Sequence, residues 1–202
     1  MADALAYFIT FSCYGNWLHG DARGSVDRKH HRYGDDLVPA DDTLKAARQA
    51  LRNDSPYRLD EPRRQAVLQA IVAITVKRGW ELLAAHVRSN HVHAVVHAPA
   101  TPIERVLNAF KAAATLRLNK SFPAERNRRR WARHGSTRYL FEPDQVAEKV
   151  DYTLFGQGEP CNDFRKELPR AASDFMSRAQ SESLSGVSGN KRAAHGASLR
   201  AE

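Results

Sequence analysis

Cysteine is scarce in this chain of 202 residues, and long apolar runs are absent. Its two cysteines, Cys13 and Cys161, lie far apart and form no CxxC pair, so neither a disulfide framework nor a zinc ribbon is indicated. No stretch approaches the roughly 18 consecutive apolar residues that a membrane span needs. The opening MADALAYFITF also lacks the basic start and the small-residue cleavage site of a secretory signal. We therefore expect a cytoplasmic protein with reduced thiols and no membrane partner.

Acidic residues are outnumbered by basic ones. The sequence has 31 Lys and Arg against 23 Asp and Glu, which gives a formal charge of +8 and a pI of about 9.8. This excess of positive charge suits an anionic partner. With 42% hydrophobic and 27% charged residues, the chain can form one core, and collagen, coiled-coil and wholly disordered classes are disfavoured.

The pattern of apolar residues predicts four strands and four helices. The strands are expected over 7–14, 81–88, 91–97 and 136–141, and the helices over 42–53, 62–78, 102–119 and 143–155. Ser89-Asn90 is a two-residue turn signal typical of an antiparallel hairpin. Apart from the short first helix, the order is β-α-β-β-α-β with an appended helix. It predicts an α+β, ferredoxin-like split βαβ fold, in which helices cover one face of an antiparallel sheet.

The composition divides the chain into one domain and a tail. We expect a domain over residues 1–168, with an inserted loop at about 15–61 that is dense in Gly, Asp and His. Residues 169–202 contain Ser, Ala, Gly and Arg with few large apolar side chains. Such a segment cannot offset the entropy of ordering, so it is predicted to be a flexible basic tail.

Two histidines form the sharpest chemical feature. On a strand, alternate side chains share a face, so His91 and His93 point the same way and supply half of a metal site. The plain alternative is a pair of polar residues on a solvated strand face. His97 has the same parity and keeps a three-histidine zinc site open, and His86 across the hairpin is a further conceivable ligand.

Tyr152 lies on the last predicted helix, away from its apolar stripe. At about 100° per residue it is roughly 200° from Val150, among the polar residues Gln145, Glu148 and Lys149. The alternative is a tyrosine lying at a helix edge. A phenol with a pKa of about 10 is a poor nucleophile until a cation stabilises its developing charge, and a divalent metal on the two histidines would do so by polarising a phosphate.

A basic segment precedes the fourth predicted strand. It combines cations that bind phosphate with an aromatic stacking surface, which favours nucleic-acid binding over a merely solvated loop. The residues are Arg126, Arg128, Arg129, Arg130, Trp131 and Arg133.

Together, these features resemble the single-tyrosine HUH transposases, the insertion-sequence-200-like family and its repeat-associated relatives. The most specific segment is SNHVHAVV, and it is accompanied by YFITFSCYGNWLHGDARGSV near the start and WARHGSTRYL before the last helix. The resemblance covers roughly residues 6 to 160. It implies a ferredoxin-like domain that binds single-stranded DNA, usually a folded hairpin.

The resemblance also implies a chemistry and a metal. Tyr152 would attack the phosphate, leaving a 5′-phosphotyrosine and a free 3′-OH, while His91 and His93 would hold Mg²⁺ or Mn²⁺. The family commonly has a third ligand four residues after the tyrosine. Here Gln157 is five residues on, after Gly156, so both Gln157 and Glu148 stay open as the third ligand.

Several alternatives remain at this stage. The protein is either a nickase and strand transferase or a host-adopted binder of DNA hairpins that does not cut, and a hydrolase using His91, His93 and His97 is a third hypothesis. Some family members are dimers that share active sites and others act as monomers, so a homodimer is also open. In the early loop, Trp17, His19 and Arg23 are expected to help bind DNA.

Overall fold

The computed structural model describes residues 4–16, 40–51 and 54–156. In chain order the elements are β1 (Ala6–Ser12), α1 (Asp42–Ala50), α2 (Glu61–Arg78), β2 (Glu81–Val87), β3 (His91–His97), α3 (Ile103–Ser121), a short 3-10 turn (Pro123–Glu125), β4 (Ser136–Leu140) and α4 (Pro143–Phe155). Each predicted strand and helix is present, with ends that differ by a few residues.

The four strands form one antiparallel sheet in the order β2-β3-β1-β4. β3 therefore lies between β1 and β2, although α2 and β2 separate it from β1 along the chain. This interleaving defines the split βαβ arrangement, so the predicted ferredoxin-like fold is confirmed. The amide of Arg88 donates to the carbonyl of His91 at 2.8 Å, which closes the β2–β3 hairpin over Ser89-Asn90.

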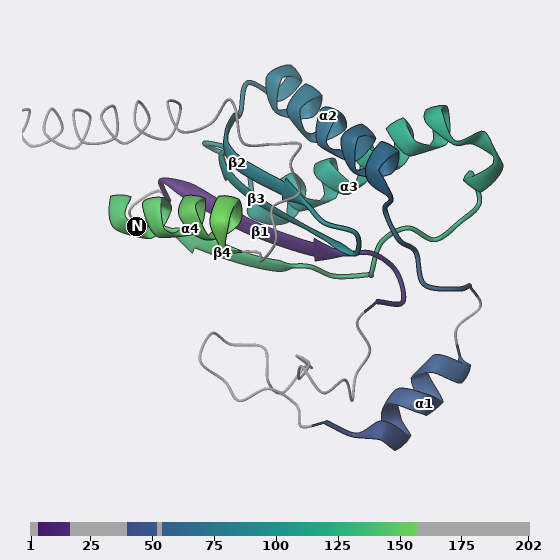
Figure 1. Cartoon of the computed structure of the whole chain (residues 1–202). Coiled ribbons are helices and arrows are strands. Elements are labelled where there is room, and N and C mark those ends of the chain that lie inside the picture. The colour runs from purple at the N-terminus through teal and green to yellow at the C-terminus, as the bar shows by residue number, and fades with distance from the viewer. Residues whose placement is uncertain (1–3, 17–39, 52–53, 157–202) are drawn as a thin grey trace, which may run out of the picture.

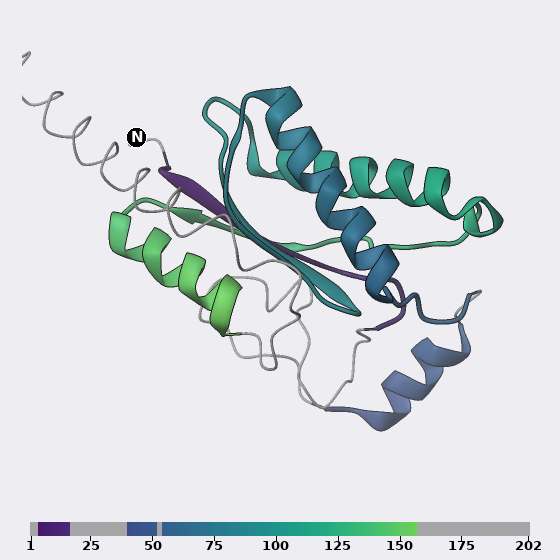
Figure 2. The ribbon, with the colours of Figure 1, turned by 45° about the horizontal axis from the view of Figure 1, so that its top comes forward.

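The helices lie on both faces of this sheet. α2 and α3 pack side by side on one face, and α4 lies against the other (Figure 1). Figure 2 shows the same three layers from a second direction. The appended helix thus covers a face that the two crossover helices leave open.

Local signals in the sequence set the ends of these helices. The Asp60 side chain accepts a hydrogen bond from the amide of Arg63 and caps α2, which ends at Gly79 in the left-handed conformation (φ 67°). At the start of α4, the Gln145 side chain accepts from the amides of Phe141 (3.0 Å) and Glu142 (3.4 Å). The helix ends at Phe155, as Gly156 in the sequence suggested.

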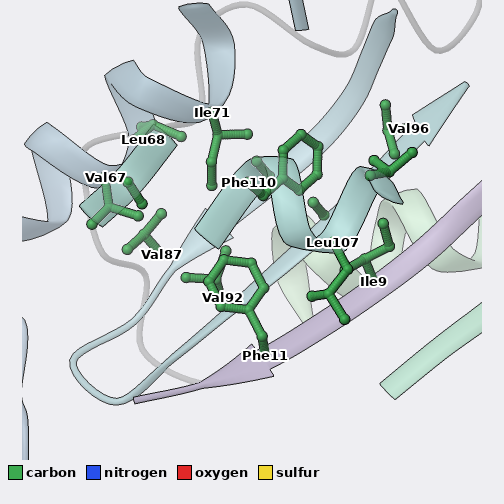
Figure 3. Close-up of a cluster of buried hydrophobic side chains, with 14 of the residues drawn as sticks. Ile9, Phe11, Val67, Leu68, Ile71, Val87, Val92, Val96, Leu107 and Phe110 are labelled. Atoms are coloured by element: carbon green, nitrogen blue, oxygen red, sulfur yellow. The ribbon is translucent and has the colours of Figure 1, made fainter. Parts of the chain in front are cut away.

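The main core lies between the sheet and the pair α2 and α3 (Figure 3). β3 contributes Val92, Ala94 and Val96 to it. Since side chains alternate along a strand, the odd-numbered residues of β3 face α4, and Val95 belongs to the second core beneath that helix. The histidines at 91 and 93 are placed on the α4 face by the same alternation.

Part of the region expected to be an inserted loop belongs to the main core. Tyr57 and Leu59 are buried there, and their amides donate to the carbonyls of Tyr14 (2.9 Å) and Ser89 (2.8 Å). Two isolated apolar residues in a short extended segment produce no periodic pattern, so their burial depends on contacts that the local sequence does not reveal.

Two further observations bear on the expectations about thiols and membranes. Cys13 is buried and, among the described residues, is a free cysteine, and burial raises the pKa of its thiol to about 12. Within the described ranges, no helix combines the length and the hydropathy required to cross a bilayer.

An ion pair joins α2 to the turn after α3. The Arg63 guanidinium binds both oxygens of Glu125, and the Tyr57 hydroxyl donates to the same carboxylate at 2.8 Å. The two charged side chains are only 20% and 24% exposed. Hydrogen bonds from Arg63 hold the pKa of Glu125 below its usual range, and Tyr57 contributes in the same direction.

Glu125→Gln is expected to lower the free energy of unfolding by about 1–3 kcal/mol at neutral pH, because it removes charge-assisted hydrogen bonds from a half-buried cluster. Folding lowers the pKa of Glu125, so its stabilisation is present above the ordinary glutamate pKa of about 4.3 and is lost as the pH falls through the lowered value. Urea unfolding of both proteins across this range checks the prediction.

The matched control is Glu148→Gln, whose carboxylate is 64% exposed in its ion pair and should contribute little to stability. Equal effects of the two substitutions, or a Glu125 effect that persists at acid pH, would contradict the expectation.

Candidate active site

The two histidines of β3 lie next to each other on the α4 face of the sheet. Their ring centroids are 4.7 Å apart. The Nδ1 atom of His91 lies 2.7 Å from Oδ1 of Asn90, and Nδ1 of His93 lies 2.7 Å from Oγ1 of Thr10. An amide oxygen only accepts, so Nδ1–H of His91 donates and the lone pair of that ring is on Nε2. The Thr10 hydroxyl fixes the orientation of His93 from the neighbouring strand.

The ring of Tyr152 on α4 packs against that of His93. Its centroid is 5.7 Å from that of His93, with an interplanar angle of 76°, and 6.0 Å from that of Phe8. Phe8 in turn stacks on His93 at 5.6 Å and 6°. Tyr152 remains 42% exposed, whereas His93 is buried. The partly exposed Tyr152 ring is therefore held against the His93 imidazole, and both rings pack against Phe8.

A lysine ion pair borders the tyrosine. The Lys149 ammonium is 5.5 Å from the Tyr152 ring centroid and 5.9 Å from the Phe8 centroid, and it donates to Glu148 at 2.7 Å. The Lys149 side chain is 15% exposed and that of Glu148 is 64% exposed. The hydrogen bond from Lys149 lowers the pKa of Glu148, and the charge of Arg138 on β4 acts in the same direction.

The other histidines of the sheet have structural contacts. His86 lies opposite His93 in the β2–β3 register, and its Nδ1–H donates to the carbonyl of Thr153 at 3.0 Å. At the far end of β3, Nδ1–H of His97 donates to the carbonyl of Leu5 at 2.7 Å. Throughout the part of the chain that the structure describes, no group of three or more His, Cys, Asp or Glu could hold a metal. Neither the three-histidine zinc site nor Glu148 as third ligand is found there.

The donors that are present nevertheless fit a divalent metal in part. His91 and His93 offer adjacent imidazole nitrogens with their Nδ1 atoms already bonded to a second partner, as metal-ligating histidines usually are. Gln157, the expected third ligand, lies outside the described residues.

In the basic segment, two residues are committed to the fold. The guanidinium of the buried Arg130 donates to the carbonyl of Glu125 at 2.9 Å. The Trp131 indole donates to Thr115 at 2.9 Å and packs edge-on against Phe11. The buried Arg130 could reach nucleic acid only by leaving this position, whereas Trp131 is partly exposed. The expected binding role of the segment stays a prediction for Trp131 and for the other arginines.

The remaining arginines of the segment lie nearer the surface. Arg126, Arg129 and Arg133 are exposed, and Arg128 is half-buried and donates to Ser55. Lys111 holds the following loop, because its ammonium donates to the carbonyls of Ala132 (2.9 Å) and His134 (3.1 Å). The expected DNA contacts of Trp17, His19 and Arg23 fall outside the described residues.

Three contributors to the site were missed by reasoning from sequence. Phe8 and Thr10 were assigned only to the first strand, and Lys149 only to the polar surroundings of Tyr152. The one available signal was parity: residues 8 and 10 alternate with the core residues Ile9 and Phe11 and therefore face α4.

The family described as "Transposase IS200 like" matches residues 53–142. This match confirms the resemblance expected from the sequence. It includes both histidines and ends before Tyr152.

Two solved structures are similar over most of the chain. One is a REP-associated tyrosine transposase bound to a REP hairpin, with 13% identity and a TM-score of 0.42 over 77% of this chain and 67% of that one. The other is a provisionally assigned transposase from Deinococcus radiodurans R1, with 15% identity and a TM-score of 0.40 over 76% of this chain and 93% of that one. No curated protein matches the chain.

Thr10→Val should change the ¹⁵N chemical shift of His93 Nδ1, because the substitution keeps the shape of the side chain and removes its hydroxyl partner. His91 should be unaffected, since its own partner is Asn90. Long-range ¹H–¹⁵N correlation spectra of the histidine rings provide the measurement.

Thr137→Val is the control, since Thr137 lies opposite Ile9 in the β1–β4 register and so on the other face of the sheet. A His93 spectrum identical in Thr10→Val and wild type would show that the hydroxyl does not position the ring.

Proposed function

We propose that the protein is a single-tyrosine DNA transposase, a single-strand endonuclease and strand transferase acting on DNA that carries a hairpin. The observation that carries this proposal is the meeting of Tyr152 with the His91 and His93 pair on one face of the sheet. A protein that only bound DNA would not require a nucleophile beside two candidate metal ligands. The match to the transposase family supports the same role.

In the proposed reaction, the Tyr152 hydroxyl oxygen attacks the phosphorus of a phosphodiester. The new O–P bond forms as the bond to the 3′ oxygen breaks, so the protein carries a 5′-phosphotyrosine and the released strand end becomes a 3′-OH. The phenol proton is lost and the 3′ oxygen gains one, so protons balance. Because one phosphodiester replaces another, rejoining requires no ATP.

The residues around Tyr152 have separate tasks in this reaction. Phe8 limits where the phenol ring can lie, and Thr10 orients His93. His91 and His93, with Gln157, would hold Mg²⁺ or Mn²⁺, and imidazole nitrogens favour Mn²⁺ of these two. A bound divalent ion would polarise the scissile phosphate and neutralise charge that develops there.

The substrate follows from the family resemblance and from charge. A net charge of +8 suits a polyanion, and the exposed arginines of the segment before β4 supply cations for its phosphates. We propose single-stranded DNA with a hairpin as the partner.

Wild-type protein incubated with labelled single-stranded DNA hairpins and Mg²⁺ or Mn²⁺ should form a covalent protein–DNA species, visible on a denaturing gel. Tyr152→Phe should abolish it, because no other atom of that ring can attack phosphorus. Tyr139→Phe is the matched control, since Tyr139 is similarly exposed (44% against 42%) and faces the opposite side of the sheet.

A covalent species in Tyr152→Phe would reject the assigned nucleophile. Hairpin binding without any covalent species in wild type would favour the host-adopted binder in place of the transposase.

His91→Ala and His93→Ala should each weaken Mn²⁺ binding at least about tenfold, because each removes one imidazole ligand. Removing only the hydrogen-bond partner of a ligand already lowers metal affinity about 10–100-fold. Isothermal titration of Mn²⁺ into the protein without DNA measures this directly. His134→Ala, in the exposed loop before β4, controls for loss of any histidine. Unchanged Mn²⁺ affinity in both variants would exclude the two as ligands.

A further inference from the structure

Lys149 is a cation that lies beside the proposed nucleophile. It precedes Tyr152 by three residues, so the two side chains lie one turn apart on the same side of α4. Its ammonium is 5.5 Å from the Tyr152 centroid, and its side chain is mostly buried against Tyr152 and Phe8. A lysine held in this way keeps its charge at a defined place beside the phenol.

The anion that neutralises Lys149 is far less constrained. Glu148 accepts from the ammonium at 2.7 Å, yet its carboxylate is 64% exposed. Exposed ion pairs of this kind contribute little to stability, so the carboxylate can leave at little cost. Arg138 acts on the same carboxylate from β4, so a single exposed acid faces two cations.

We propose that Lys149 binds a phosphate of the DNA backbone beside Tyr152, and that Glu148 occupies this position in the DNA-free protein. Binding then exchanges a carboxylate for a phosphodiester at the same ammonium. This inference rests on the proposed function, because it needs DNA in the site. It assigns to α4 a phosphate contact in addition to its tyrosine.

The chemistry of the two anions supports the exchange. Lysine presents three N–H donors on a compact charge, which suits the oxygens of a phosphodiester as well as those of a carboxylate. Because the ammonium already lies near the Phe8 and Tyr152 rings and the Lys149 side chain is only 15% exposed, the ammonium would not have to move when its partner changes. The Lys149 ammonium is then already beside Tyr152 before DNA binds.

Salt dependence of binding tests the contact separately from cleavage. All variants carry Tyr152→Phe, and the probe is a fluorescein-labelled DNA hairpin with a single-stranded flank, titrated in EDTA at several salt concentrations. Lys149→Met should reduce the slope of log K against log salt by about 0.7–0.9, the value for one lost phosphate contact. Lys77→Met, on an exposed turn of α2 on the other face, should leave the slope unchanged.

Glu148→Gln should raise affinity about two- to fivefold, the equivalent of an exposed ion pair, and this gain should disappear in the double variant Glu148→Gln, Lys149→Met. Lys149→Arg should keep the slope. If Lys149→Met fails to fold by circular dichroism, the Glu148→Gln gain decides the matter, and no gain would overturn the inference.

An unchanged slope in folded Lys149→Met would overturn the inference, and so would unchanged affinity in Glu148→Gln. Neither result would affect the proposed function, which depends on the covalent species. Failure of every variant to bind hairpin DNA would instead reject the proposed function.

Discussion

The alternation of side chains along β3 is the constraint on which the rest of the structure depends. Val92, Ala94 and Val96 complete the core beneath α2 and α3, and His91 and His93 must therefore point to the opposite face. The two-residue Ser89-Asn90 turn fixes the register of this strand against β2. A slip of one residue would exchange the two faces, turning valines toward α4 and imidazoles into the core beneath α2 and α3. Stability of the core and position of the site are therefore enforced together.

The second face of the sheet becomes a site because a short helix covers only part of it. Val146 and Val150 anchor α4 over Leu83 and Val95, and the carbonyl of Thr153 accepts a hydrogen bond from His86. These contacts lie on the side of α4 that meets the sheet. Tyr152, the neighbour of Thr153, lies at the margin of this contact, where its ring packs against Phe8 and His93 yet remains 42% exposed.

Local patterns predicted the elements, the hairpin, the shared face of His91 and His93, and the position of Tyr152 off the apolar stripe. The contacts of Thr10 and Trp131 were beyond such patterns. Thr10 contacts His93 only because β1 pairs with β3, a strand far away in the sequence. The position of Trp131 depends on a backbone β-bridge to Cys13, which is also distant in the sequence. A run of arginines with one tryptophan has the same composition whether it is solvated or folded against the core, so nothing local could separate Arg130 and Trp131 from their exposed neighbours.

The ion pairs of Glu125 and Glu148 differ in the solvent exposure of the carboxylate, 24% against 64%. The less exposed carboxylate stabilises the fold, whereas the more exposed one can exchange its partner. Glu125 accepts from Arg63 and Tyr57 in a half-buried cluster, so releasing it would leave donors unsatisfied away from water. Glu148 has water available as soon as it leaves Lys149. If Glu148 leaves, the Lys149 ammonium stays near the Phe8 and Tyr152 rings without a counter-ion. An unpaired ammonium in this position favours the binding of another anion. Under the proposed function, this anion is a phosphate of the DNA backbone bound beside Tyr152.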